Sequence, residues 1–228
     1  MECGGFPGTG VKKITPDAIF FDFDGVLVDS TPIKVNAFHK LYAEHGPEIQ
    51  AKVDAYMKGN EGISRVQKIR YAHKEFLGID LTDAQLDEWV GRYASLVEDA
   101  VTRCPWVPGA HDFLDAQLGQ CPMFVVSGTP EDEILRIAER RAMDRYFDAL
   151  RGSPPDKPPI VRELLAGHNL APERCLFVGD APFDHETAEV TGLRFIGRVP
   201  DGAASPFPEG TVTLPDLTGL RDAMDALA

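Results

Sequence analysis

The chain has 228 residues, of which 43% are hydrophobic and 26% charged, and its formal net charge is −13. This length suits one large domain or a core domain with an insertion, and the acidic balance argues against a general binder of nucleic acids or anionic membranes. No apolar run is long enough to span a membrane. The N-terminus lacks a basic region followed by an apolar segment, so we expect a cytoplasmic protein. The four cysteines form no C-x-x-C pair, so we expect no zinc site.

Short apolar runs alternate with helical patterns along most of the chain, after a glycine-rich segment, residues 1–16, that is predicted to form a flexible tail. Buried parallel strands are predicted at 18–23, 122–127, 174–180 and 193–197, with weaker strands at 147–150 and 211–214. Helices are predicted over 131–142, 160–170, 183–192 and 217–227. This alternation predicts an α/β fold with a doubly wound, Rossmann-like parallel sheet.

One region interrupts the alternation. Between residues 31 and 104 the patterns are helical, and Thr82 with Gln85 resembles a capping box that opens a long helix. The proline-rich stretch TRCPWVPG then ends the helix before the alternation resumes. We therefore predict an all-helical cap domain, residues 31–104, inserted after the first strand of an α/β core domain formed by residues 17–30 and 105–228.

Polar side chains follow the ends of the predicted strands. Ligands bind beyond the carboxyl ends of the strands in an open parallel sheet. Four segments would meet there: Asp22-Phe23-Asp24, Ser127-Gly128-Thr129, the loop with Lys157, and Gly179-Asp180 with Asp184 one helical turn later. Each segment alone also has a structural explanation, as a solvated turn, a helix N-cap, a surface lysine or an acidic helix start.

The four segments together have complementary chemistry. Several carboxylates repel one another, so a hard divalent cation such as Mg²⁺ is their natural partner. A hydroxyl, free backbone N–H groups at a helix start and one lysine would form a cradle for a phosphate group. The combination predicts phosphoryl transfer through an aspartyl-phosphate.

The order of these segments resembles the four motifs of the haloacid dehalogenase superfamily. Residues 21–26 (FDFDGV) match the first motif, 125–128 (VVSG) the second, Lys157 the lysine of the third and 179–184 (GDAPFD) the fourth. The helical insert is similar to the C1 cap of phosphoglycolate phosphatase-like and β-phosphoglucomutase-like members. The resemblance implies an enzyme of the phosphoric monoester hydrolase class that depends on Mg²⁺.

The resemblance also implies a role for each matched residue. Asp22 would be the nucleophile that attacks phosphorus, and Asp24 would act first as general acid and then as general base. The phosphoryl oxygens would be held by Ser127, Gly128 and Lys157. The expected Mg²⁺ site consists of Asp22, the backbone carbonyl of Asp24, and Asp180, with Asp184 close by or orienting bound water.

Residues of the predicted cap bear on the substrate. β-Phosphoglucomutase-like sequences carry a histidine early in the first cap helix, where this chain has Lys34; this disfavours a mutase without excluding it. Lys34 is either a substrate contact or a solvated lysine. In the stretch KGNEGISRVQK, residues 58–68, Arg65 and Lys68 are expected to contact a second anionic or polyhydroxyl part of the substrate, unless the stretch is only a turn between helices.

The sequence therefore predicts a phosphatase for a small phosphorylated metabolite, such as a sugar phosphate or phosphoglycolate, without a nucleic-acid or membrane partner. The acid at Asp24 supports phosphate-ester chemistry, because dehalogenases and phosphonate hydrolases generally lack an acid there. A phosphomutase and a non-catalytic phosphate-binding protein are the alternatives.

His185 matches no motif, and both a structural role and a ligand role are open. Neither the substrate nor the oligomeric state follows from the sequence.

Overall fold

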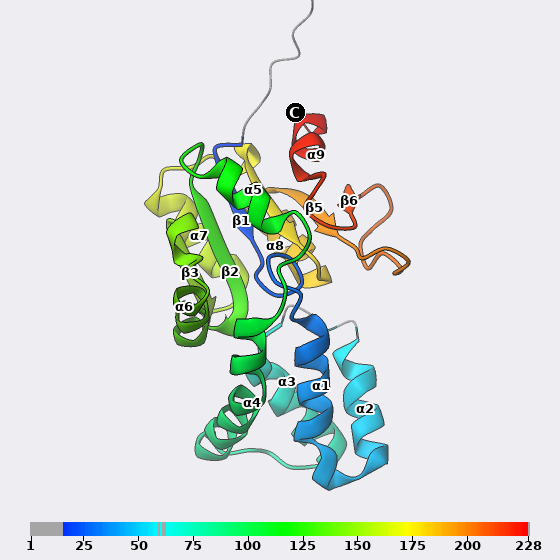
Figure 1. Ribbon diagram of the computed structural model, residues 1–228. Helices are drawn as coiled ribbons and strands as arrows, with labels where there is room; N and C mark the ends of the chain where they lie inside the picture. Colours follow the sequence, from blue (N-terminus) through cyan, green and yellow to red (C-terminus); the bar gives the residue numbers. More distant parts are fainter. Residues whose placement is uncertain (1–15, 59, 61–62, 228) are drawn as a thin grey trace, which may run out of the picture.

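The computed structural model describes residues 16–58, 60 and 63–227. Within them, six strands form one parallel sheet in the order β3-β2-β1-β4-β5-β6 (Figure 1). The strands are β1 (Ala18–Phe21), β2 (Met123–Pro130), β3 (Ala149–Ser153), β4 (Cys175–Gly179), β5 (Arg194–Arg198) and β6 (Thr213–Leu214). The chain runs outward from β1 on both sides, so the predicted doubly wound sheet is confirmed, and its strand order reverses beside β1.

Helices cover both faces of the sheet, and the side chains of β1 alternate between them. Ile19 and Phe21 join the core under α5, α6 and α9, whereas Ala18 and Phe20 join the core under α7 and α8. Because both faces are buried, β1 is apolar at every position. These helices are α5 (Ala110–Gln117), α6 (Glu131–Arg140), α7 (Lys157–Gly167), α8 (Pro182–Thr191) and α9 (Leu220–Ala226).

Five α-helices lie between β1 and β2 in the described part of the chain, and the first four of them form a separate layer beyond one end of the sheet (Figure 1). They are α1 (Thr31–Leu41), α2 (Pro47–Met57), α3 (Arg65–Ala72) and α4 (Asp83–Arg103), and we call them the helical insert. Short 3-10 helices at Ala43–His45, Asp144–Tyr146 and Pro172–Arg174 and a π-helix at His73–Leu77 complete the helical segments. The capping box predicted at Thr82 is present at the start of α4.

The two chain segments that join the insert to the sheet run side by side. The N–H of Asp29 donates to the carbonyl of Pro105 over 2.9 Å, and the N–H of Val107 donates to the carbonyl of Leu27 over 3.0 Å. Paired connections of this kind suit a hinge between two bodies. The division into a core domain and a cap domain, with its boundaries, stays a prediction.

Some local expectations were wrong. The weak third strand was expected at 147–150 but spans Ala149–Ser153, and Lys157, expected in a loop, is the first residue of α7. The helix α5 was not predicted. The flexible tail predicted for residues 1–16 lies, except for its last residue, outside the described residues. None of the described helices combines the length and apolar character needed to cross a membrane.

Candidate active site

The first carboxylate of the site directly follows β1. Asp22 is 3% exposed, and its N–H donates to the carbonyl of Val178 in β4 over 2.9 Å. The chain then turns at Gly25, which has a φ of 78°. A Cβ at Gly25 would lie 1.9 Å from Oδ2 of Asp180. Glycine is therefore required at this position, both for the left-handed backbone and for the close approach of the turn to Asp180.

Lys157 lies between two of the carboxylates. Its Nζ is 2.8 Å from Oδ1 of Asp22 and 2.5 Å from Oδ1 of Asp184, and all three side chains are buried. Burial alone would lower the pKa of Lys157, but the carboxylates of Asp184 and Asp22 outweigh it and raise that pKa above its ordinary value. The amine is therefore a permanent cation at the carboxyl edge of the sheet.

The other oxygen of Asp184 organises the turn that carries Asp180. Oδ2 of Asp184 accepts hydrogen bonds from the N–H of Asp180 over 3.2 Å and from the N–H of Ala181 over 3.1 Å. Asp184 is the third residue of α8, so it caps its own helix and fixes the preceding turn. The position of Asp180 beside Asp22 therefore depends on Asp184.

Asp22, Asp180 and Asp184 form the acidic cluster that could bind a metal ion within the described residues, with carboxylate oxygens within 4.8 Å of one another. Burial raises the pKa of Asp22 to about 7, although the Lys157 ammonium acts in the opposite direction. Burial and the neighbouring Asp22 and Asp184 carboxylates also raise the pKa of Asp180 well above its ordinary value. Three carboxylates face one ammonium here, so the cluster lacks positive charge, and an oxygen-binding divalent cation such as Mg²⁺ fits it.

Asp24 lies apart from that cluster and is held by three donors. Ser30 donates to its Oδ1 over 2.5 Å, Thr129 donates to its Oδ2 over 3.0 Å, and the ammonium of Lys34 forms an ion pair with the same Oδ2. Burial alone would raise the pKa of Asp24, but Lys34, together with Ser30 and Thr129, outweighs it and lowers that pKa below its ordinary value. In this arrangement Asp24 is a carboxylate.

Lys34 connects the helical insert to the core. It lies on α1 and contacts both Asp24 and Oγ1 of Thr129, the latter over 2.6 Å. The sequence left open whether Lys34 touches the substrate or is solvated. The structure gives it two partners from the core, and Lys34 also lines the pocket together with Asp22; its contact with substrate stays a prediction.

Ser127 and Gly128 lie where β2 passes the acidic cluster. Ser127 is buried, and its Oγ accepts a hydrogen bond from the N–H of Thr129 over 3.1 Å. Gly128 lines the pocket together with Thr129. Lys157, Ser127 and Gly128 also line one small recess beside that pocket; their predicted binding of a phosphate group stays a prediction.

Arg65 pairs with a core acid that was not predicted. Its guanidinium donates two hydrogen bonds of 2.6 Å to the carboxylate of Glu133 in α6, and the two side chains are 4% and 3% exposed. The guanidinium also lies 4.7 Å from the ring centroid of Tyr93. Arg65 and Lys68 line the pocket; their predicted contact with substrate stays a prediction. Gly59, Glu61 and Gly62 of the same stretch lie outside the described residues.

Residues of the core and of the insert line a pocket of about 70 Å³. Its polar lining includes Asp22, Asp24 and Asp180 from the core and Lys34, Arg65 and Lys68 from the insert, and its apolar lining includes Val35, Phe38, Met57, Ile63 and Tyr93. Carboxylates thus lie on one side and cations on the other. Such a pocket suits a small anion bound next to a cation.

His185 lies outside this pocket. Its ring packs edge-on against Phe195 at 5.2 Å and lies 6.3 Å from the ring of Phe207. The contacts are those of a structural histidine.

Comparison with known proteins identifies the family. The sequence profile of the haloacid dehalogenase-like hydrolases matches residues 16–192. Among curated proteins, a phosphoglycolate phosphatase of Pseudomonas putida is 26% identical over 201 residues, which cover 84% of this chain and 71% of that protein. A phosphorylated carbohydrates phosphatase of Thermotoga maritima is 22% identical over 194 residues, covering 79% of this chain and 83% of that protein.

Solved structures share the fold. A β-phosphoglucomutase of Clostridium difficile superposes with a TM-score of 0.74 over 93% of this chain and 98% of its own, at 17% sequence identity. At that identity the likeness shows the arrangement of sheet and helices, and nothing about the substrate.

Proposed function

The chain belongs to the haloacid dehalogenase-like hydrolase family, and we propose that it is a Mg²⁺-dependent phosphatase that hydrolyses a small phosphate ester through an aspartyl-phosphate on Asp22. The observation that carries this proposal is the grouping of Asp22, Lys157, Asp180 and Asp184 at the carboxyl edge of β1 and β4, next to the separately held Asp24. One carboxylate is available for attack and another for proton transfer, which is the minimum for two-step hydrolysis.

In the first step, a carboxylate oxygen of Asp22 attacks phosphorus and the bond from phosphorus to the alcohol oxygen breaks. Lys157, with Ser127 and the N–H of Gly128, would bind the phosphoryl oxygens. A Mg²⁺ ion held by Asp22, Asp180 and Asp184, with the Asp24 backbone carbonyl, would supply the positive charge that keeps Asp22 ionised and the phosphoryl oxygens neutralised. This step needs Asp22 as the anion. Burial raises the pKa of Asp22 to about 7, so positive charge beside it would favour the reactive state.

Asp24 would move the protons. It gives a proton to the alcohol oxygen in the first step and takes one from water in the second, when water attacks the aspartyl-phosphate. The carboxylate state favoured by Lys34 suits the second step. Because Lys34 belongs to the helical insert, opening of the insert would remove its charge from Asp24, and the carboxyl could then take up the proton that the first step needs.

The names of the relatives support a phosphorylated metabolite as substrate. Curated relatives are a phosphoglycolate phosphatase and a phosphorylated carbohydrates phosphatase, and the small pocket with cations on its insert side fits an anionic ester.

The test is phosphate release from p-nitrophenyl phosphate and from a panel of phosphorylated metabolites, with and without Mg²⁺. We expect release that requires the metal and disappears in Asp22→Asn. Absence of metal-dependent release from every ester would contradict the proposal. Dependence on a bisphosphate activator with little net phosphate release would instead indicate a phosphomutase.

A further inference from the structure

The C-terminal end of α4 is held by one arginine of the core. Arg141 directly follows α6. The two hydrogens of its Nη1 are shared among the carbonyl oxygens of Val101, Thr102 and Cys104, which lie 3.2, 2.9 and 2.8 Å from the nitrogen. The last carbonyls of an α-helix have no donor within the helix, and the negative end of the helix dipole attracts a cation. Arg141 therefore stabilises the end of α4 through both its hydrogen bonds and its charge.

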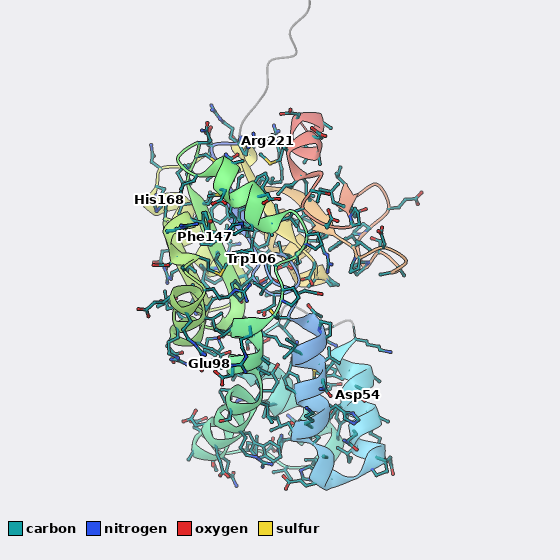
Figure 2. All side chains as sticks on the ribbon, in the orientation of Figure 1. Asp54, Glu98, Trp106, Phe147, His168 and Arg221 are labelled. Carbon is teal, nitrogen blue, oxygen red and sulfur yellow. The ribbon has the colours of Figure 1, made fainter. Side chains whose placement is uncertain are left out.

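The same guanidinium contacts the connection between α4 and the core. Its Cζ lies 5.0 Å from the ring centroid of Trp106, in the segment that returns from the insert. Trp106 in turn forms an isolated antiparallel bridge with Val28, in the segment that leads into the insert. Figure 2 labels Trp106 in the returning segment and Glu98 on α4. Arg141 thus lies where the end of α4 and the two connecting segments meet.

Two ion pairs also join α6 to α4, but solvent weakens both. Arg136 pairs with Glu98 over 3.1 Å, and Arg140 pairs with Asp99 over 2.8 Å. The two arginine side chains are 48% and 43% exposed, and ion pairs in contact with solvent add little to stability. Arg141 is only partly exposed, so its contacts are the ones that fix the end of α4.

The position of α4 matters because α4 carries a tyrosine that contacts two of the insert cations lining the pocket. Tyr93 is 1% exposed and lies about three helical turns before the end of α4. Its ring lies 4.7 Å from the guanidinium of Arg65, and its hydroxyl donates a long hydrogen bond, 3.4 Å, to the carbonyl of Lys34. Arg65 and Lys34 are the residues that pair with Glu133 and Asp24 of the core. A shift of α4 would therefore displace both cations from their partners in the core.

We propose that Arg141 is a positioning residue of the active site. By fixing the end of α4 beside α6, it places Lys34 and Arg65 against the core without touching the substrate or the metal. Arg141 is absent from the described residues that line the pocket and the recess beside it, so its loss removes no substrate contact there. The effect on turnover rests on the proposed phosphatase function, whereas the effect on α4 does not.

The first test measures hydrogen–deuterium exchange in Arg141→Met, which keeps the aliphatic stem and loses the guanidinium. We expect a loss of protection confined to the insert, with faster exchange of the α1 and α4 amides and unchanged exchange of β1 and β4. Arg162→Met is the matched control, because Arg162 of α7 donates to the carbonyl of Val190 in the last turn of α8 over 3.1 Å. This control should leave α1 and α4 at the wild-type rates.

The second test is turnover of p-nitrophenyl phosphate with saturating Mg²⁺. We expect kcat/KM to fall at least ~10-fold in Arg141→Met, because small misplacements of groups in an active site are costly. Arg141→Lys should recover part of the loss, since an ammonium also offers three donors to the carbonyls. The Mg²⁺-induced increase in Tm should stay at its wild-type value in both variants, because the proposed metal ligands belong to the core.

Three results would overturn the positioning role. They are wild-type exchange of α1 and α4 in Arg141→Met, faster exchange there with unchanged kcat/KM, and faster exchange throughout the chain with loss of the Mg²⁺ response. The last of these would show that Arg141 only stabilises the fold. Failure of wild type to hydrolyse p-nitrophenyl phosphate with Mg²⁺ would overturn the phosphatase function, and the anchoring of α4 by Arg141 would then be decided by the exchange data.

Discussion

Arg65 of the helical insert and Glu133 of the core form a bidentate ion pair that is almost fully buried, with both N···O distances at 2.6 Å. Arg65 also lines the pocket between the insert and the core. A buried pair of this geometry fixes the relative position of the two groups that carry it, and removal of one partner leaves the other charge without compensation.

Loss of one partner should therefore destabilise the fold. Glu133→Ala is expected to lower the free energy of unfolding by about 3–5 kcal/mol, and Arg65→Met combined with Glu133→Leu should restore most of it. Urea denaturation measures both. Glu48→Ala, which removes the exposed pair between Glu48 and Lys52, should give no measurable change. Equal stability of Glu133→Ala and Glu48→Ala would show that the buried pair does not hold the insert.

Removal of Lys34 should shift the pH dependence of turnover. Lys34 lowers the pKa of Asp24, so its loss raises that pKa, and the carboxylate needed to activate water becomes protonated at a higher pH. The acidic limb of kcat should therefore move to higher pH in Lys34→Met and stay near wild type in Lys34→Arg. The profile is measured with p-nitrophenyl phosphate and saturating Mg²⁺. An unmoved limb in Lys34→Met would mean that Asp24 is not the base.

Mg²⁺ should stabilise the folded protein through the acidic cluster. A ligand present at about 100 times its Kd adds roughly 2.7 kcal/mol to the free energy of unfolding. We expect Mg²⁺ to raise Tm in wild type and in Asp222→Asn, an exposed acid on α9, but not in Asp180→Asn. Removal of the metal with EDTA should abolish activity. The same Mg²⁺-induced increase in Tm in Asp180→Asn would remove Asp180 from the metal site.

Protonation of a buried histidine should destabilise the insert in acid. Burial lowers the pKa of His73 below its ordinary value of 6.5, and nearby His45 and Arg92 act in the same direction. Below pH 6.5 the unfolded chain therefore binds a proton that the folded chain does not. The free energy of unfolding keeps its full value above that pH and falls as the pH decreases below it. The decrease in the free energy of unfolding between pH 7.5 and 5.5 should be smaller in His73→Gln. His111→Gln, at an exposed histidine, should show the same decrease as wild type. The same decrease in His73→Gln would show that His73 is not the group that destabilises the insert in acid.

The fold and the catalytic motifs were accessible from the sequence because their signals are local. The apolar run of β1 leads directly into Asp22, and the capping box at Thr82 is complete within four residues. The third strand was placed two residues early because β3 lies at the sheet edge with only partly buried side chains, which weakens the apolar pattern. Lys157 was expected in a loop because prolines flank it, yet proline at the first turn is compatible with the start of α7.

The partners of the site residues were not predicted, because they come from distant parts of the chain. Glu133 is 68 residues from Arg65, and Thr129 is 105 residues from Asp24. Thr129 was named only as the end of the segment Ser127-Gly128-Thr129, without Asp24 as its partner, and Ser30 was given no role in the site. No spacing rule connects such positions, and only the packing of α1, α3 and α6 brings them together.

Direct detection of the covalent intermediate tests the account most sharply. Wild type is mixed with p-nitrophenyl phosphate and Mg²⁺, quenched in acid within one turnover, digested and analysed by mass spectrometry. The proposed mechanism predicts one phosphoryl group on Asp22 that is absent in Asp22→Asn and accumulates when Asp24, the base for the second step, is replaced by asparagine. Phosphate release by wild type without any phosphorylated Asp22, or with the phosphoryl group on another residue, would contradict the central claim.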